Sequence, residues 1–239
     1  MHQVLRQNLA DAYHIIAMWG LDDSTYAHIS LRTDENHFLI LPFGLLFEEV
    51  TPSSLLLVNL NGNVIQGVEK QYNQTGYAIH GSIYKARPEL NAIFHLHTHA
   101  SIAVSASPRG LLPISQWALH FYDQISYEDY DSLVLDPSTQ GMNLASQLGK
   151  NRVMLQKNHG VLTCGQTIHE ALFYVHHLEQ ACRVQAFAPE PKDGWILPSH
   201  ETCLKARKDL LSFEKDLGKR DWEAYKRQLI RKQHLAEVI

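Results

Sequence analysis

Three histidines at alternate positions are the residues of this sequence best suited to chemistry. The run from Ala92 to His99 begins apolar and then carries His95, His97 and His99. In a β-strand alternate side chains lie on the same face, so His95 and His97 would share one face of a sheet. Neutral imidazoles are typical ligands of Zn²⁺. The Ala- and Ser-rich stretch that follows Thr98 indicates that the strand ends there, which would turn His99 elsewhere; a longer strand would add His99 to the pair.

A catalytic zinc site needs a third protein ligand and keeps a fourth position open. His159 is the best candidate, because the Asn158-His159-Gly160 segment lies where two β-like runs meet and glycine permits backbone shapes that most residues resist. A His-x-His pair by itself is a weak signal. The alternative is that these histidines are polar strand residues satisfied by hydrogen bonds.

Composition narrows the class of protein. Hydrophobic residues make up 45% of the 239-residue chain, and the net charge is −4. The absence of a dense Lys/Arg cluster argues against a nucleic-acid or membrane-surface partner. No apolar stretch approaches the ~18 residues of a membrane helix, and the N-terminus lacks a signal-peptide pattern, so a cytoplasmic location is expected. The unpaired spacing of Cys164, Cys182 and Cys203 predicts reduced, buried thiols.

The hydrophobic pattern predicts interleaved helices and strands. Helices are expected at residues 3–19, 75–86 with Thr75 as N-cap, 101–106, 144–148, 168–187, 204–217 and 222–235. Strands are expected at residues 26–32, 37–41, 55–60, 64–67, 92–98 and 152–156. Residues 161–164 are expected to continue the last of these strands beyond Asn158-His159-Gly160. Residues 121–130 have the aromatic and acidic composition of an active-site loop. Tight connections such as Asn61-Gly62 favour α/β layers on a mixed or largely antiparallel sheet.

The ordered set of motifs resembles the class II aldolase/adducin family over about residues 3–188. The similar segments are residues 77–106, Asn158-His159-Gly160, His28-Ile29-Ser30 and Pro42-Phe43-Gly44. Arg87-Pro88 before the histidine pair, Ala103-Val104-Ser105-Ala106 after it and the segment 110–116 resemble the adducin-related branch more than the sugar-phosphate aldolases. Such an ordered set is more specific than any single motif.

The resemblance implies a fold and an assembly. The fold would be a three-layer α/β/α sandwich on a mixed, mainly antiparallel central sheet. Residues 1–239 would form a single domain of this kind, with a helical extension from about residue 189. The family commonly assembles as a homotetramer with sites between subunits. It also implies that His95, His97 and His159 bind Zn²⁺ or another divalent metal.

The chain departs from the aldolases at the positions that carry their chemistry. Their acid/base glutamate lies nineteen positions before the first metal histidine, where this chain has Gly76. That glycine could leave space for a substrate carboxylate near the metal. His80, four residues on, is expected to pack or to orient its helix. The resemblance implies that the substrate pocket contains Gly76, His28, Ser30, Gly44 and Thr75. This set has fewer small hydroxyl side chains than the phosphate clamp of the aldolases.

A metal held by three histidines can polarise a carbonyl and stabilise an enediolate. Proton transfer would then fall to Tyr127, Tyr130, Glu128 or His99. We therefore expect a zinc-dependent, aldolase-type carbon–carbon lyase acting on a small hydroxy-carbonyl or hydroxy-acid compound. One alternative is a non-catalytic, adducin-like scaffold or partner-binding protein, against which the retention of all three histidines argues. A further alternative is a metal-dependent dehydratase or epimerase.

Overall fold

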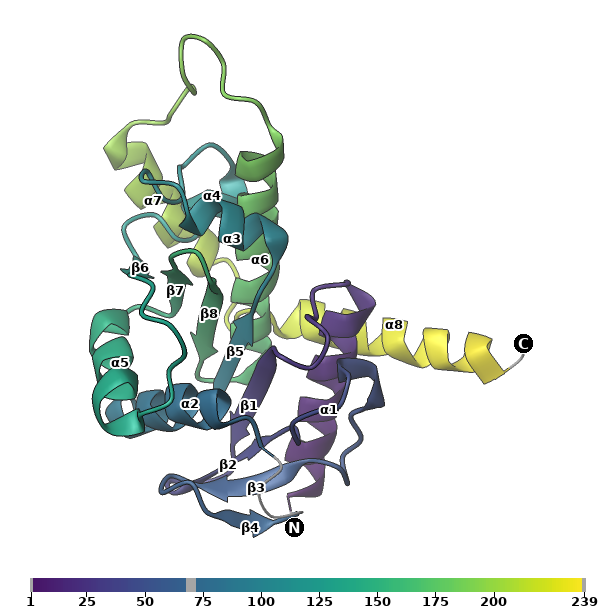
Figure 1. The fold of residues 1–239 in the computed structure, drawn as a ribbon. Helices are drawn as coiled ribbons and strands as arrows, with labels where there is room; N and C mark the ends of the chain where they lie inside the picture. The colour runs from purple at the N-terminus through teal and green to yellow at the C-terminus, as the bar shows by residue number, and fades with distance from the viewer. Residues whose placement is uncertain (1, 68–71, 238–239) are drawn as a thin grey trace.

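The computed structural model describes residues 2–67 and 72–237 and contains an eight-stranded mixed sheet with helices on both faces (Figure 1). The strand order is β4-β3-β2-β1-β5-β8-β7-β6, and β6–β7 is the parallel pair in an otherwise antiparallel sheet. The strands are β1 (His28–Arg32), β2 (His37–Ile40), β3 (Leu56–Asn59), β4 (Val64–Gln66), β5 (Ala92–Leu96), β6 (Ile125–Glu128), β7 (Val153–Gln156) and β8 (Gly160–Gly165). This arrangement confirms the predicted α/β fold.

Helices cover the two faces of this sheet. The helices are α1 (Gln3–Met18), η1 (Phe47–Glu49), α2 (Gln74–Ala86), α3 (His99–Ser105), α4 (Gln116–Leu119), η2 (Pro137–Gly141), α5 (Met142–Leu148), α6 (Ile168–Phe187), α7 (His200–Leu211) and α8 (Lys219–Glu237). Helices α2 and α5 pack together on one side of the sheet, and α1 and α6 lie on the other (Figure 1). None of the helices within the described ranges has the length and apolar character needed to cross a bilayer.

The central strand β1 is buried on both faces, but the two faces differ in chemistry. Every residue of β1 is buried. On the α1 face, the hydroxyl oxygen of Tyr13 accepts hydrogen bonds from the backbone N–H groups of Ile29 (3.0 Å) and Leu41 (3.2 Å). On the α2 face, His28 and Ser30 contact polar side chains of the helix. Alternation along one strand therefore places polar groups in the interior of the protein, where each needs a partner.

Three local predictions were wrong. Residues 121–130 are not all loop, because residues 125–128 form β6, an edge strand that pairs with β7 alone and leaves Tyr127 exposed. The run after residue 160 does not continue β7 but returns antiparallel to it as β8. The N-cap of α2 is Asn73, whose Oδ1 accepts the N–H of Thr75 at 3.0 Å. The cysteines are free and buried, as predicted.

Candidate metal centre

The fold brings His95, His97 and His159 together where the central strand β5 ends and its neighbour β8 begins. His95 lies near the end of β5, His97 follows the strand, and His159 lies in the turn between β7 and β8. Because β5 pairs with β8, that turn lies beside the end of β5. One ring nitrogen of each histidine lies within 4.8 Å of the other two, and Nε2 of His95 is 2.9 Å from Nε2 of His97. The three predicted ligands therefore form one cluster.

The cluster fits a divalent metal ion. Three ligands of a tetrahedral zinc ion at about 2.0–2.1 Å are roughly 3.4 Å apart. This value lies between the 2.9 Å that separates the His95 and His97 nitrogens and the 4.8 Å that bounds the whole cluster. Nδ1 of His97 donates to Oδ2 of Asp23 at 2.8 Å, so Nε2 of His97 carries the free lone pair. A carboxylate behind a histidine is the usual outer partner of a metal ligand.

Asp23 is a functional candidate that sequence reasoning missed. It precedes β1 and is 74 residues from His97 in the chain. In sequence it is one polar residue of a turn, with no spacing relation to the histidines. Only the antiparallel pairing of β1 with β5 places it behind His97.

The turn that carries His159 depends on two neighbours in different ways. Asn158 has φ of 59°, the left-handed conformation that asparagine tolerates better than most residues. Gly160 has no positive φ, which corrects the prediction that its backbone shape is the special feature. Glycine is needed here because the backbone at position 160 passes close to the end of β5. A Cβ at this position would overlap the carbonyl oxygen of Leu96 and lie 3.0 Å from Cδ2 of His97.

Burial keeps the candidate ligands in the neutral form that binds metal. The pKa of His95 lies well below its ordinary value because the ring is buried, and the neighbouring imidazoles lower it further. Burial, together with the nearby His97, lowers the pKa of His159 to about 4. Both rings are therefore uncharged near pH 7 and have lone pairs available for an ion.

The space beside Gly76 is filled by His28. A Cβ at position 76 would lie 3.1 Å from Cδ2 and 3.2 Å from Cγ of that ring. The prediction that Gly76 leaves room for a substrate carboxylate is therefore wrong, because an imidazole already occupies this space. The His28 ring also stacks on His95, with centroids 4.8 Å apart and planes at 30°.

The other predicted pocket residues lie in different surroundings. Ser30 is fully buried, and its Oγ lies 2.5 Å from Nδ1 of His80. The hydroxyl of Thr75 donates to Oδ1 of Asn73 at 2.7 Å. Gly44 has φ of 100° and no atom within 4 Å of the place a Cβ would take. His80 contacts both His28 and Ser30, so it orients side chains rather than only packing the helix.

Two of the four proton-transfer candidates lie next to the cluster. Glu128 and Tyr130 line a small hollow of about 30 Å³ together with His159. The rings of Tyr130 and His159 have centroids 6.2 Å apart. Glu128 accepts a hydrogen bond from Nε2 of Gln156 at 2.6 Å, and burial raises the pKa of its carboxyl.

The other two candidates face elsewhere. The hydroxyl of Tyr127 accepts the N–H of Leu111 at 3.0 Å, on the far side of β6 from Glu128. His99 is the exposed first residue of α3. Within the described ranges, neither makes a hydrogen bond or ring contact with the three histidines.

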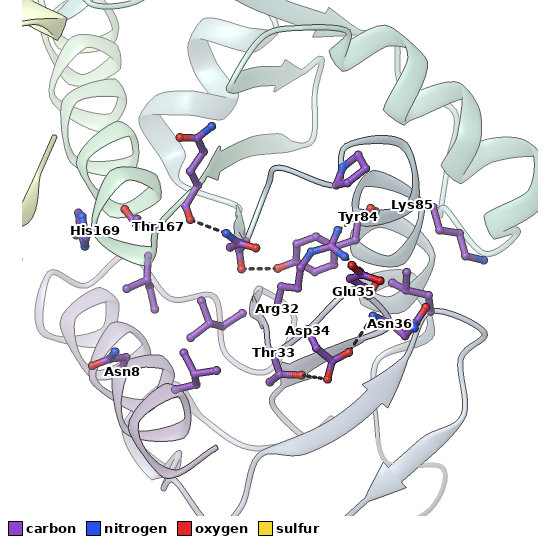
Figure 2. A pocket seen from close by; sticks show the side chains of 17 residues that line it. Asn8, Arg32, Thr33, Asp34, Glu35, Asn36, Tyr84, Lys85, Thr167 and His169 are labelled. Carbon is purple, nitrogen blue, oxygen red and sulfur yellow. Dashed lines mark hydrogen bonds between the residues drawn. The ribbon is translucent and has the colours of Figure 1, made fainter. Parts of the chain in front are cut away.

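A cavity of about 920 Å³ lies at the opposite end of β1 (Figure 2). Its most buried charge is Arg32, which lies over the Tyr84 ring at 4.5 Å and donates to the backbone carbonyls of Leu90 (2.9 Å) and Tyr84 (2.6 Å). These hydrogen bonds give the Arg32 guanidinium a structural role. In the part of the chain that the structure describes, a three-ligand cluster occurs only at the histidines.

The fold and this cluster define an α/β sandwich with a candidate three-histidine metal centre. The family model described as Class II Aldolase and Adducin N-terminal domain matches residues 7–186. The chain belongs to this family, which confirms the resemblance noted in the sequence.

Similar proteins include both adducins and aldolases. Alpha-adducin of Mus musculus is 40% identical over 188 residues, which cover 77% of this chain and 25% of the adducin, so the match spans about a quarter of that relative. The structure of an aldolase II superfamily protein from Pseudomonas syringae aligns with a TM-score of 0.86 at 37% identity, covering 96% of this chain and 93% of that one. L-fuculose 1-phosphate aldolase from Glaciozyma antarctica PI12 aligns with a TM-score of 0.84 at 30% identity, covering 97% and 90%.

Proposed function

We propose that this protein is a zinc-dependent, aldolase-type carbon–carbon lyase that acts on a small hydroxy-carbonyl or hydroxy-acid compound. The observation that carries the proposal is the cluster of His95, His97 and His159, oriented by Asp23, in a chain of the class II aldolase and adducin family. The similarity to an L-fuculose 1-phosphate aldolase supports an aldolase-type reaction. We place the enzyme in the cytoplasm, as the sequence pattern predicts, and we propose that it forms a homotetramer, in line with the family resemblance.

The three histidines would hold the ion, which when bound supplies Lewis-acid polarisation of a substrate carbonyl. The chain's own residues must then move the proton. We assign this role to Glu128, with Tyr130 beside it, because both line the hollow next to His159. A raised carboxyl pKa brings Glu128 closer to the range in which a group can both accept and release a proton. This assignment compensates for the absence of a carboxylate at Gly76.

The first test is metal content. Protein purified without a nickel affinity step is expected to hold about one zinc ion per chain, which His97→Ala removes. His37→Ala is the matched control, since His37 also pairs with an aspartate, Asp34 at 2.8 Å, but lies outside the cluster. A metal-free wild-type protein would end the proposal.

The second test is turnover. Hydroxy-carbonyl and hydroxy-acid compounds are screened for cleavage with and without a chelator, and Glu128→Gln is expected to lower kcat by about 10²–10⁴-fold while metal stays bound. Loss of activity without loss of metal would place Glu128 in the chemistry. An unchanged kcat would remove it from the proton-transfer role.

The adducin similarity supports a second candidate function, a scaffold without turnover. Bound metal with no cleavage of any compound screened would favour this scaffold. Dehydration or epimerisation products in the same assays would instead favour the dehydratase or epimerase alternative.

A further inference from the structure

A row of buried polar side chains connects β1 with α2. We call it the β1–α2 ladder, and it consists of His28, Ser30, His80 and Tyr84. His28 and Ser30 alternate along β1, and His80 and Tyr84 are one turn apart on α2, so all four meet at one interface. Nδ1 of His28 lies 2.9 Å from Nε2 of His80, Nδ1 of His80 lies 2.5 Å from Oγ of Ser30, and that Oγ lies 2.9 Å from the Tyr84 hydroxyl.

The far end of the ladder decides where its protons lie. The Tyr84 hydroxyl donates to the backbone carbonyl of Asn91 at 3.2 Å, and a carbonyl can only accept. Tyr84 has one proton and gives it to Asn91, so we assign the Ser30 hydroxyl as the donor to Tyr84. His80 then donates from Nδ1 to Ser30, and His28 donates from Nδ1 to His80. In this arrangement both imidazoles are neutral, and every proton of the ladder has an acceptor.

The near end of the ladder rests against a candidate metal ligand. The His28 ring stacks on His95, and it also lies close to Gly76, where a Cβ would be 3.1 Å from Cδ2 of His28. Nδ1 of His95 is buried and has no hydrogen-bond partner among the described residues, whereas His97 is oriented by Asp23. A metal-binding histidine almost always has an outer hydrogen-bond partner that sets its ring plane. His95 lacks one, so another contact must fix its orientation.

We propose that the β1–α2 ladder is the positioning device for the metal ligand His95. The ladder holds His28 in the neutral Nδ1–H form and in one ring orientation, and the stacked His28 ring then sets the plane of His95. A neutral ring at this place also adds no positive charge beside a divalent cation. The inference rests on the metal site of the proposed function but not on turnover.

The tautomer of His28 is the direct test. In long-range ¹H–¹⁵N spectra of histidine-labelled metal-free protein, His28 is expected to show a protonated Nδ1 and an unprotonated Nε2. Its signals are assigned by their loss in His28→Phe. Tyr84→Phe removes the donor to Asn91, which frees Ser30 to donate to His80 and allows the reverse order of protons. The His28 signals are then expected to shift toward the Nε2–H form.

Tyr13→Phe is the matched control for this substitution. Tyr13 is an equally buried tyrosine that bonds to β1 from its other face, at Ile29. Its loss should leave the His28 tautomer unchanged. An Nε2–H form in the wild-type protein, or the same spectrum in Tyr84→Phe and wild type, would overturn the inference.

Metal affinity is the second readout. His28→Phe keeps a stacking ring but loses the bond to His80, and the affinity for Zn²⁺ is expected to fall by about 10-fold or more, the range found for outer partners of metal ligands. His120→Phe is the control, because His120 is a buried histidine outside the cluster. Its ring packs against that of His177, with centroids 4.4 Å apart. Equal affinity in His28→Phe and His120→Phe would refute the positioning role. If the tautomer and the Zn²⁺ affinities are as expected here but the wild-type protein cleaves none of the compounds screened, only the proposed lyase activity is refuted.

Discussion

Adding one methyl group at Gly76 tests how rigidly the site is built. Gly76 and Gly81 both lie within α2. Replacing either by alanine should stabilise the helix by about 1 kcal/mol through helix propensity alone. Any difference between the two variants therefore reports what the new methyl group meets.

The structure predicts opposite outcomes at the two positions. At position 76 the Cβ would lie 3.1 Å from the His28 ring, below the 3.4–4 Å of ordinary contact. His28 cannot withdraw, because His80 holds its Nδ1 and His95 lies against its face. Overpacking of this kind costs about 1–3 kcal/mol. The net effect of Gly76→Ala is thus a loss of up to about 2 kcal/mol.

The methyl group at Gly81 also meets a ring, with Cε2 of Tyr77 at 3.1 Å. Tyr77 is held by a hydrogen bond from its hydroxyl to the carbonyl of Leu60 at 2.9 Å, at the far end of the ring. The ring borders a cavity of about 540 Å³, so its Cε2 edge can tilt by a few tenths of an ångström without breaking that bond. Gly81→Ala is therefore expected to be neutral or stabilising.

Urea unfolding of the metal-free variants measures this difference. The midpoint of Gly76→Ala should lie below that of Gly81→Ala at an unchanged m-value, which shows that stability rather than compactness has changed. If Gly76→Ala is as stable as Gly81→Ala, His28 can move, and the reasoning about a fixed ring is refuted.

Three further outcomes follow from the same geometry. Asp23→Asn should weaken zinc binding about 10–100-fold in a competition titration, and unchanged affinity would contradict its orienting role. Gly160→Ala should lower the free energy of unfolding by about 1–3 kcal/mol and also weaken zinc binding, because its Cβ overlaps the carbonyl of Leu96. Burial lowers the pKa of His80 and of His177 to about 3 each, so below pH 6.5 the unfolded chain binds more protons than the folded one. Urea midpoints of the metal-free protein should therefore fall from pH 6.5 toward pH 4 and stay flat above pH 7; a flat profile across the whole range would contradict this.

Strong periodicity allowed most elements to be predicted. The long helix α6 matches the predicted range 168–187, and β1, β2 and β7 match their predicted runs within two residues. The strand β6 was missed, because an edge strand with acidic and aromatic side chains has the composition of a loop. The N-cap of α2 was misplaced by two residues, since Asn73 and Thr75 are both good capping residues and only the backbone geometry distinguishes them.

Some residues of the candidate site could likewise be identified from the sequence, and others could not. His95 and His97 could be paired from sequence, since the alternation of a β-strand is a local property of the chain. The place of His159 could be suggested by a local turn and by family resemblance. Asp23 could not be found, because its role depends on which strands pair.

The amino-acid sequence by itself determined the candidate ligands, the type of most elements and the family, because these follow from residue types, local spacing and the order of motifs along the chain. The tertiary structure decided what fills the space at Gly76 and which groups orient the ligands. The His28 ring enters that space only because β1 packs against α2, and its orientation depends on a hydrogen-bond chain that ends at Asn91. Such contacts join residues far apart in the chain, so no local pattern contains them.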